Sequence, residues 1–385
     1  MKKLKIGVDA VPLVRLTSGV GYYIFHLLDH LIKQKKECAF ILYSHSDQGD
    51  IAHFKQYPNV QIRKIPFLAA AHSIWSQTTL AFYAWKDHLD VFWGSTQSIP
   101  LWKRKKMHTI LTLYDFVYLL FPEMASPMKC LYQKIFCPKF LNAANYILPI
   151  SFGTAERLKQ FYGKGYCDVV APPIKPEMHY KNKNSIVPLL SIHGLKYNHY
   201  LVTVGTLEPR KNFVSLIQAY IQILKKNNKE RILPLVIIGS GGWKNKKILQ
   251  ALHEAQEQYP KHIKLMGHVS NEDLSSYLSG ARYYLMLSVY EGYGMPIAEA
   301  RCCRTPVICL DVPEMKEAAE NDGIFIKNAR LEQQLEIALL DCQKNSEEEK
   351  PQLSIQYASN EEKALKLAKI LTEIQKNLDL RHIFN

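Results

Sequence analysis

The sequence predicts an α/β fold made of two Rossmann-like domains. Its 385 residues exceed one ordinary core and suit two domains of roughly 150–200 residues each. Apolar residues make up 47% of the chain, so both halves can bury a core. Strand-like apolar runs alternate with amphipathic helical runs from end to end, and this alternation is typical of parallel sheets flanked by helices.

The first half opens with a buried strand, LKIGVDAV at 4–11, which precedes an amphipathic helix at 21–34. Four further strands are expected at 38–44, 60–66, 89–95 and 109–115. Residues 139–151 then predict a helix followed by a strand, and residues 154–163 predict another helix.

The second half shows the same alternation more clearly. Its expected strands lie at 200–206, 234–240, 262–269, 283–289 and 305–311. Its expected helices lie at 212–224, 243–259, 271–281, 295–303, 313–319 and 360–378. The two halves therefore read as two copies of one architecture rather than as a short-period repeat.

A proline-rich stretch at 172–176, followed by the polar run HYKNKNS, separates the two series. The predicted organisation is an N-terminal domain at 1–185, a linker at 186–198, a C-terminal domain at 199–355, and a terminal helix at 356–385 that packs back toward the N-terminal domain.

Positive charge is concentrated in the first half. Residues 1–196 carry 25 Lys and Arg against 12 Asp and Glu, a net +13, whereas residues 197–385 carry 24 against 23, a net +1. This asymmetry suggests a polyanionic partner, either nucleic acid or an anionic membrane, and a merely solubilising surface explains it equally well. Two segments mix cations with apolar side chains as membrane-surface segments do: WKRKK at 102–106 and MKCLYQKIFCPKFL at 128–141. Pro138 predicts that the second is a short helix followed by a separate piece.

Composition also excludes several classes of protein. No run of about 18 uncharged apolar residues occurs, so no segment is predicted to cross a membrane. Lys5 and Asp9 interrupt the apolar start, which does not resemble a signal peptide. We therefore expect a cytoplasmic location, including the inner face of the membrane. The eight cysteines lack zinc-ligand spacing and are expected to be reduced thiols.

The most informative segment is SVYEGYGMPIAEA at 288–300. A strand ends here, a glycine-containing loop follows, and Pro296 suits the first position of a new helix. A helix that begins at the carboxyl edge of a parallel sheet presents free N–H groups and partial positive charge, which suit a diphosphate. Glu291 and Glu299 flank that position and can accept hydrogen bonds from hydroxyls. The alternative is an acidic turn in which Glu299 only caps the helix.

A second segment, TLEPRKN at 206–212, follows another strand. Arg210 and Lys211 lie where the next helix is expected to begin. Cations beside a helix N-terminus are unfavourable unless an anion lies between them, and a diphosphate would be such an anion. Two solvated surface cations are the alternative.

Together these segments resemble family 4 glycosyltransferases of the GT-B fold, of the kind that assemble bacterial surface polysaccharides. Glu291 and Glu299 match the family's Glu-x7-Glu motif. Gly205, Arg210 and Lys211 match its G-x-x-x-x-R-K element. The further matches are the strand end at 239–241, the base-binding loop GHVSNEDL at 267–274, the glycine loop TSGVGYY at 17–23 and LTLYDFVYLLFPE at 111–123. The resemblance covers most of residues 199–325 and is looser in the first half.

The resemblance implies two Rossmann-like domains facing a central cleft, with the acceptor side in the N-terminal domain and the nucleotide-sugar donor in the C-terminal domain. It implies that Glu291 binds the donor sugar, that Glu299 binds the ribose, and that Arg210 and Lys211 hold the diphosphate and stabilise the departing nucleotide. The other expected donor contacts are Gly19, Gly21, Gly205, Gly239, Val269, Gly292, Tyr293, Gly294 and Met295. No metal or other cofactor is implied, and no D-x-D occurs in the sequence.

The chain departs from the family pattern in two places. Where the family often has His-Asp, this chain has Tyr114 and Asp115, which become the candidate catalytic residues on the acceptor side. An ordinary tyrosine titrates near pH 10 and is a poor proton shuttle, although it can donate one hydrogen bond. In the second place, ARCCRTP at 300–306, Arg304 stands where the family commonly has a small residue.

The predicted function is retaining transfer of a hexose from a nucleotide-diphospho-sugar, with GDP-mannose as the first choice. The acceptor is expected to be a glycan or lipid-linked saccharide in cell-surface polysaccharide synthesis, and the partners to include an anionic membrane but no nucleic acid. Two alternatives stay open: a nucleotide-sugar epimerase on the same fold, and an inactive basic scaffold protein.

Overall fold

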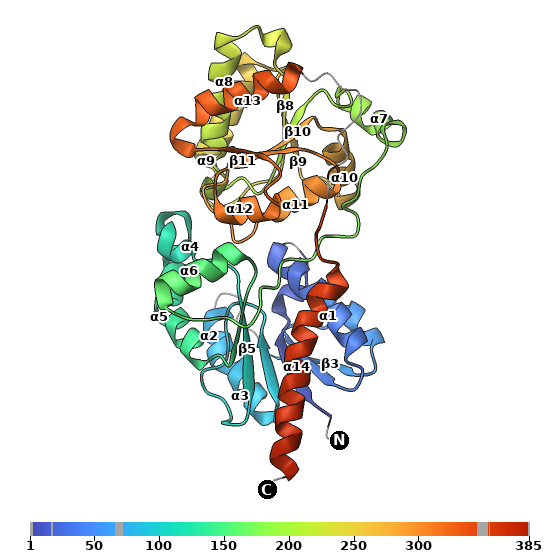
Figure 1. Ribbon diagram of the computed structural model, residues 1–385, viewed down its shortest axis with the longest axis vertical. Coiled ribbons are helices and arrows are strands. Elements are labelled where there is room, and N and C mark those ends of the chain that lie inside the picture. Colours follow the sequence, from blue (N-terminus) through green and yellow to red (C-terminus); the bar gives the residue numbers. More distant parts are fainter. Residues whose placement is uncertain (1–2, 17, 66–71, 345–352, 354, 384–385) are drawn as a thin grey trace. The chain divides into compact units, whose positions relative to one another are not determined.

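The computed structural model describes residues 3–16, 18–65, 72–344, 353 and 355–383. The chain divides into two compact units (Figure 1). Unit 1 consists of Met1–Pro173 and Tyr357–Asn385, and unit 2 consists of Ile174–Gln356. Thr17, the first residue of the glycine loop predicted from the sequence, lies outside the described residues.

Unit 1 is built on a parallel six-stranded sheet in the order β3-β2-β1-β4-β5-β6. Its strands are β1 (Lys5–Asp9), β2 (Ala39–Ser44), β3 (Val60–Lys64), β4 (Val91–Gly94), β5 (His108–Leu113) and β6 (Tyr146–Pro149). Ile6 is in register with Phe40 on one side and with Val91 on the other. Five of these strands are almost continuously buried, as expected where helices cover both faces of a parallel sheet, whereas the edge strand β3 is partly exposed.

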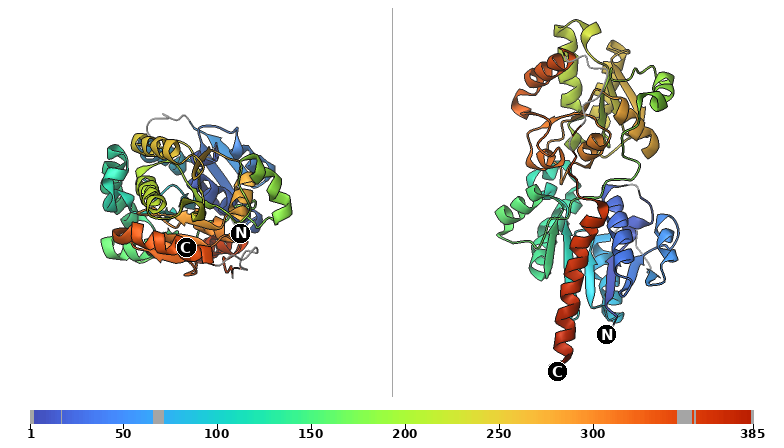
Figure 2. Two further views of the ribbon diagram at one scale, coloured as in Figure 1. Left: turned by 90° about the horizontal axis from the view of Figure 1, so that it is seen from above. Right: turned by 45° about the vertical axis from the view of Figure 1, so that its right-hand side comes forward.

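The helices of unit 1 follow the amphipathic pattern of the sequence. They are α1 (Gly19–Gln34), α2 (His72–Gln77), α3 (Thr79–Lys86), α4 (Val117–Leu120), α5 (Pro127–Ala143), α6 (Phe152–Tyr162) and α14 (Asn360–Ile383), with 3-10 turns at η1 (Val11–Leu13), η2 (Asp50–Gln56) and η3 (Pro122–Met124). The C-terminal helix α14 packs along α1 (Figures 1 and 2). The buried Lys363 of α14 donates a hydrogen bond of 2.9 Å to the carbonyl of Pro172, which anchors α14 to the last residues of unit 1 before the chain enters unit 2.

Unit 2 has a second parallel sheet, in the order β12-β11-β10-β7-β8-β9. Its strands are β7 (Leu201–Val204), β8 (Leu235–Ile238), β9 (Ile263–Gly267), β10 (Tyr283–Met286), β11 (Val307–Leu310) and β12 (Ile324–Ile326). Its helices are α7 (Lys183–Ile192), α8 (Phe213–Lys226), α9 (Lys246–Gln258), α10 (Asn271–Gly280), α11 (Met295–Cys302), α12 (Pro313–Ala318) and α13 (Leu331–Lys344), with 3-10 turns at η4 (Pro209–Lys211), η5 (Lys229–Arg231) and η6 (Asn328–Arg330). Helix α8 contacts α9, and α11 contacts both α10 and α12, which agrees with two sets of helices on opposite faces of the sheet when the crossovers are right-handed.

The domain boundary predicted at residue 185, with a linker at 186–198, is wrong. The chain passes into unit 2 directly after Pro173. The expected linker belongs to unit 2 because α7 buries Ile186 and Leu190 against α10. A β-carbon built on Gly280 would come within 2.7 Å of Leu190, so this contact is close.

Residues 128–141 also differ from the prediction, because α5 continues as one helix through Pro138. The proline ring removes one backbone donor from the helix. Burial of Cys137, Phe140 and Leu141 on both sides of Pro138 holds the helix together across it.

Among the residues that the structure describes, none of the helices combines the length and apolar content needed to cross a bilayer.

Candidate functional site

The centre of the candidate site is a buried carboxylate held by two cations. Arg210 and Lys211 lie in η4 after β7, and Glu291 lies in the loop after β10. Because β7 and β10 are neighbours in the parallel sheet, their carboxyl ends meet at one edge. There, Oε2 of Glu291 lies 2.5 Å from a guanidinium nitrogen of Arg210, and Oε1 lies 2.7 Å from Nζ of Lys211.

The charges of this cluster balance one another inside the chain. Burial alone would raise the pKa of Glu291, but Lys211 and Arg210 outweigh it and lower the pKa to about 2. Arg210 also pairs with Glu208 at 2.7 Å and donates a hydrogen bond of 2.9 Å to the carbonyl of Tyr290. The alternative of two solvated surface cations is therefore wrong, and the anion between the cations in this structure is Glu291.

Glu299 is the second carboxylate of the motif and lies in α11. Its side chain is buried, and Gly294 rather than Glu299 is the N-cap residue, so the acidic-turn alternative is wrong. Gly294 has φ +107°, which favours glycine. The helix begins at Met295, as predicted, so Pro296 occupies its second position rather than the first.

Lys175 approaches Glu299 from the segment that enters unit 2. Its Nζ lies 3.2 Å from Oε1 of Glu299, in an ion pair without hydrogen-bond geometry. Burial raises the pKa of Glu299 above its ordinary value, and the charge of Lys175 opposes that shift. Sequence reasoning missed Lys175, because no local pattern connects it to a residue 124 positions later.

The glycines and neighbouring residues of the motif lie at the same edge of unit 2. Gly205 and Gly239 end β7 and β8, and a β-carbon on Gly239 would lie 1.9 Å from the carbonyl oxygen of Gly205. Glycine is therefore required at 239 by the close approach of two backbones. The remaining predicted residues of unit 2 are Val269 in the turn between β9 and α10, and Gly292, Tyr293 and Met295 around the start of α11.

The predicted residues of unit 1 are Gly19 and Gly21 at the start of α1, and Tyr114 and Asp115 after β5. The Tyr114 side chain is buried and its hydroxyl donates a hydrogen bond of 2.6 Å to the carbonyl of Ser95. The Tyr114 hydroxyl would therefore have to break this hydrogen bond before it could donate one to a ligand. Asp115 is half-buried and accepts a hydrogen bond from the Val117 amide at 3.1 Å.

Arg304 now has a structural explanation. It follows α11 with φ +56°, the left-handed conformation that often ends a helix and favours glycine. Its guanidinium lies over the ring of Tyr180, 4.6 Å from the ring centroid. This cation–π contact offsets part of the cost of placing a larger residue there.

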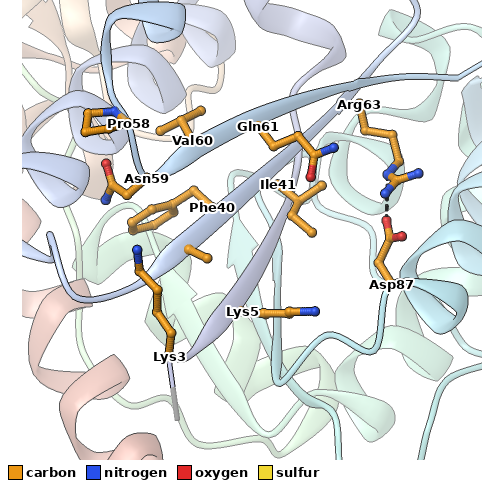
Figure 3. A pocket seen from close by; sticks show the side chains of 11 residues that line it. Lys3, Lys5, Phe40, Ile41, Pro58, Asn59, Val60, Gln61, Arg63 and Asp87 are labelled. Carbon is orange, nitrogen blue, oxygen red and sulfur yellow. Dashed lines mark ion pairs between the residues drawn. The ribbon is translucent and has the colours of Figure 1, made fainter. Parts of the chain in front are cut away.

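A shallow depression of about 260 Å³ lies elsewhere in unit 1 (Figure 3). Its lining includes Lys3, Lys5 and Asn59, and Arg63 pairs with Asp87 at 2.8 Å on one side of it. It opens at the amino ends of β1, β2 and β3, whereas open α/β sheets bind ligands at the carboxyl ends. Within the described part of the chain, no three His, Cys, Asp or Glu side chains gather in a way that could hold a metal ion.

A known family and several known proteins are similar to parts of this chain. Residues 193–360 match the family described as "Glycosyl transferases group 1". The O-antigen chain mannosyltransferase B of Escherichia coli is 26% identical over 266 residues, 68% of each chain. A serotype-specific mannosyltransferase WbdA of Escherichia coli is 29% identical over 124 residues, which are 32% of this chain and 15% of WbdA.

Solved structures agree on the fold. Anabaena Alr3699/HepE in complex with UDP-glucose has a TM-score of 0.65 at 15% identity, over 98% of this chain and 99% of its own. WaaG, a glycosyltransferase involved in lipopolysaccharide biosynthesis, has a TM-score of 0.60 at 15% identity, over 89% of this chain and 91% of its own. At this identity the likeness shows the fold alone.

Two parallel six-stranded sheets with helices give the chain the two-domain GT-B architecture of these structural neighbours. The cation–carboxylate cluster lies within residues 193–360, the part of the chain that matches the group 1 family. The match to this family and to the O-antigen mannosyltransferase supports a glycosyltransferase, and the structural neighbours show the GT-B fold.

The buried cluster generates a stability prediction. Glu291→Gln removes the charge that balances Arg210 and Lys211, and we expect it to lower the free energy of unfolding at pH 7 by about 3–5 kcal/mol in urea denaturation. The double variant Glu291→Gln/Lys211→Met should cost less than the sum of the single variants, by about 0.5–3 kcal/mol.

The contribution of the Glu291 charge to the free energy of unfolding should decrease as the pH falls. The pKa of Glu291 is lowered from 4.5 to about 2, so its contribution is complete above pH 4.5 and is lost as the pH falls toward 2. Glu332→Gln, in the exposed pair with Lys226, is the control and should change stability little. Additive single variants, or a Glu291→Gln effect that grows in acid, would contradict the charge balance.

Proposed function

We propose that this chain is a retaining, metal-independent mannosyltransferase that uses GDP-mannose and acts on a glycan or lipid-linked acceptor in cell-surface polysaccharide synthesis. The observation that carries the proposal is the buried Glu291–Arg210–Lys211 cluster within a group 1 glycosyltransferase domain. The matched O-antigen mannosyltransferase favours mannose as the sugar and a polysaccharide as the product. Retention of configuration follows from the family resemblance.

The cluster supplies the chemistry that the departing nucleotide needs. Arg210 and Lys211 bind the diphosphate and stabilise its charge as the glycosidic bond breaks, which is commonly the largest catalytic contribution. Glu291 fixes both cations in place and accepts hydrogen bonds from donor-sugar hydroxyls. No metal ion is needed in this arrangement, because two cations and the N-terminus of α11 neutralise the diphosphate.

Glu299 binds the hydroxyls of the ribose. Its Oε1 is buried and accepts no hydrogen bond from the residues that the structure describes, so it can accept one from a ligand hydroxyl. Gly205, Gly239, Val269, Gly292, Tyr293, Gly294 and Met295 complete the donor contacts in unit 2. In unit 1, Asp115 contributes to acceptor binding and Tyr114 positions the backbone of Ser95.

If GDP-mannose is the donor, different nucleotides should stabilise the protein to different extents, with GDP stabilising it most. GDP should raise the melting temperature more than UDP, dTDP or ADP, and Arg210→Ala should abolish the shift because it removes a charged contact to the diphosphate. Transfer from GDP-mannose should survive EDTA. If another nucleotide raises the melting temperature more than GDP does, the donor is a sugar carried by that nucleotide and not GDP-mannose. If activity is lost in EDTA and restored by Mg²⁺ or Mn²⁺, a metal ion takes part in the departure of the nucleotide. Sugar released equally with and without acceptor would favour the epimerase.

Lys175 predicts a pH-dependent nucleotide affinity. Lys175→Met should raise the pKa of Glu299 further, because burial and the charge of Glu177 already raise it and only Lys211 would remain to oppose them. A protonated Glu299 accepts ribose hydroxyls less well. The Kd of the variant, divided by that of the wild type, should therefore increase as the pH falls from 8 to 5.5. Lys175→Arg keeps the charge and should follow the wild type, whereas parallel profiles for all three proteins would contradict this role.

We also propose that unit 1 docks on an anionic phospholipid surface through the outer face of α5. Met128, Leu131 and Ile135 recur at helical spacing and are 79%, 60% and 46% exposed. Exposed lysines at 129, 134 and 139 accompany them. Unit 1 contains 26 Lys and Arg against 15 Asp and Glu, a net +11, and unit 2 contains 23 against 20, a net +3. Apolar side chains among cations suit the headgroup region of such a membrane.

The segment WKRKK contributes less than the sequence suggested. Lys103 is partly buried, its Nζ donates hydrogen bonds to Thr109 and the carbonyl of Ala143, and burial lowers its pKa. Arg104 lies over the ring of Trp85, which stacks on Trp102. Of the four cations in this segment, Lys105 and Lys106 are exposed, and Lys103 and Arg104 are half-buried in contacts within unit 1.

Liposome sedimentation checks the α5 surface. The wild type should bind vesicles that contain anionic lipid, and 0.5 M salt should weaken binding by screening. Replacing Met128, Leu131 and Ile135 by Ser should weaken it further because the apolar contact is lost. Ile192→Ser, at a residue of unit 2 that is 76% exposed, is the control. Equal binding to neutral and anionic vesicles, or no effect of the triple variant, would contradict this docking mode.

A further inference from the structure

The carboxyl edge of the unit 1 sheet carries a buried carboxylate at its switch point. The first strand, β1, lies between β2 and β4, so the direction of chain progression reverses between β1 and β4. In open α/β sheets this position opens a crevice in which ligands bind. Asp9 is the last residue of β1, and residues 95–98 follow β4 at the same place.

Asp9 orients an imidazole at this edge. The carboxylate is 1% exposed, and its Oδ2 accepts hydrogen bonds from Nε2 of His72 at 2.9 Å and from the hydroxyl of Thr96 at 2.8 Å. Burial opposes protonation of the ring, but the charge and hydrogen bond of Asp9 raise the pKa of His72 above its ordinary value. The His72 side chain is 33% exposed and packs beside the buried Trp75, with ring centroids 5.6 Å apart. Asp9 is therefore shielded from solvent, whereas the ring that it holds is partly accessible.

The loop after β4 is held firmly in place beside this pair. The Ser95 hydroxyl donates to the carbonyl of Asp9 at 2.8 Å, and the carbonyl of Ser95 accepts from Tyr114. Gln97 accepts a hydrogen bond from the Tyr114 amide at 3.0 Å and donates one to the carbonyl of Asp115 at 3.1 Å. These bonds fix the half-exposed side chains of Thr96, Gln97 and Asp115 along one edge. A row of fixed donors and acceptors suits a ligand that carries several hydroxyls.

We infer that His72, oriented by Asp9 and flanked by Thr96, forms a subsite of unit 1 that binds a hydroxyl of the acceptor saccharide. The inference rests on the proposed glycosyl transfer and adds residues that lie outside the sequence motifs. His72 makes the contact with the sugar, and Asp9 is a positioning residue. Asp9 balances the charge of His72, and Asp115 adds a negative charge at the same edge, so the subsite favours a neutral sugar over a phosphate.

Two reactions of a His72→Gln variant distinguish acceptor binding from cleavage of the donor: transfer to an added acceptor, and hydrolysis of the donor without acceptor. We expect His72→Gln to lower kcat/KM for the acceptor, methyl α-mannoside, by about 10–100-fold, mainly through KM, because one hydrogen bond involving a charged group is lost. The donor is the nucleotide sugar selected by the melting screen. Release of the nucleotide by hydrolysis without acceptor should stay within about twofold of the wild type on the same grounds. Thr96→Val should produce a smaller loss of the same kind.

His53→Gln is the matched control. His53 pairs with Asp29 at 2.7 Å, and its side chain is 37% exposed, but the pair lies between α1 and η2 rather than at the switch point. His53→Gln should change neither the rate of transfer to the acceptor nor the rate of donor hydrolysis. The inference would be overturned if a folded His72→Gln protein kept the wild-type kcat/KM for the acceptor. It would also be overturned if hydrolysis of the donor without acceptor fell as much as transfer to the acceptor.

A binding measurement covers the case in which the wild type neither hydrolyses nor transfers any donor, which would be a failure of the proposed function itself. In protein labelled with ¹³C at histidine, methyl α-mannoside should shift the imidazole signals of His72, which are assigned by their absence from His72→Gln. The signals of His53 should not move. Absence of a His72 shift at saturating sugar would overturn the acceptor subsite independently of turnover.

Discussion

The pairing of Glu291 with Arg210 and Lys211 is the constraint on which the donor half of the structure depends. A buried carboxylate is costly alone, and Glu291 is stable here because two half-buried cations, Arg210 and Lys211, pair with it. The cluster also joins two loops, since the amide of Val289 donates a hydrogen bond of 3.0 Å to the carbonyl of Arg210. The ends of β7 and β10 are therefore fixed relative to one another by charge and by backbone, and α11 starts from a defined position.

The charge balance between Glu291 and the two cations, Arg210 and Lys211, allows the donor site to be ordered before a nucleotide binds. Two cations without a counter-ion would repel each other and extend into solvent, where ordering them for a diphosphate would cost entropy. Glu291 keeps them at the carboxyl edge, and the same logic places Lys175 beside Glu299. In each case a buried carboxylate determines where a flexible cation lies, so ligand binding requires little rearrangement of the chain.

The parts of the structure that the sequence predicted are those encoded by nearby residues. Strand and helix alternation in unit 2 follows from local apolar periodicity, and the motif around Glu291 follows from glycine and proline placed between a strand and a helix. The errors have a common physical cause. Helix α7 was taken for a linker because its burial depends on α10, about 80 residues later, and α5 continues through Pro138 because of tertiary packing. Lys175 and His72 were missed because their partners, Glu299 and Asp9, are 124 and 63 positions away.

Each of the two sheets has a buried carboxylate, paired with a cationic or protonatable side chain, at its topological switch point. In each sheet the first strand lies between the second and the fourth: β1 between β2 and β4, and β7 between β8 and β10. At each switch point a buried carboxylate is balanced by a cationic or protonatable side chain from another segment, Glu291 by Arg210 and Lys211 in unit 2 and Asp9 by His72 in unit 1. The carboxylate follows the fourth strand in unit 2 but ends the first strand in unit 1, so the two arrangements are not copies of one motif. Their chemistry differs accordingly: two permanent cations suit a diphosphate, whereas one oriented imidazole beside hydroxyl and amide groups suits a neutral sugar.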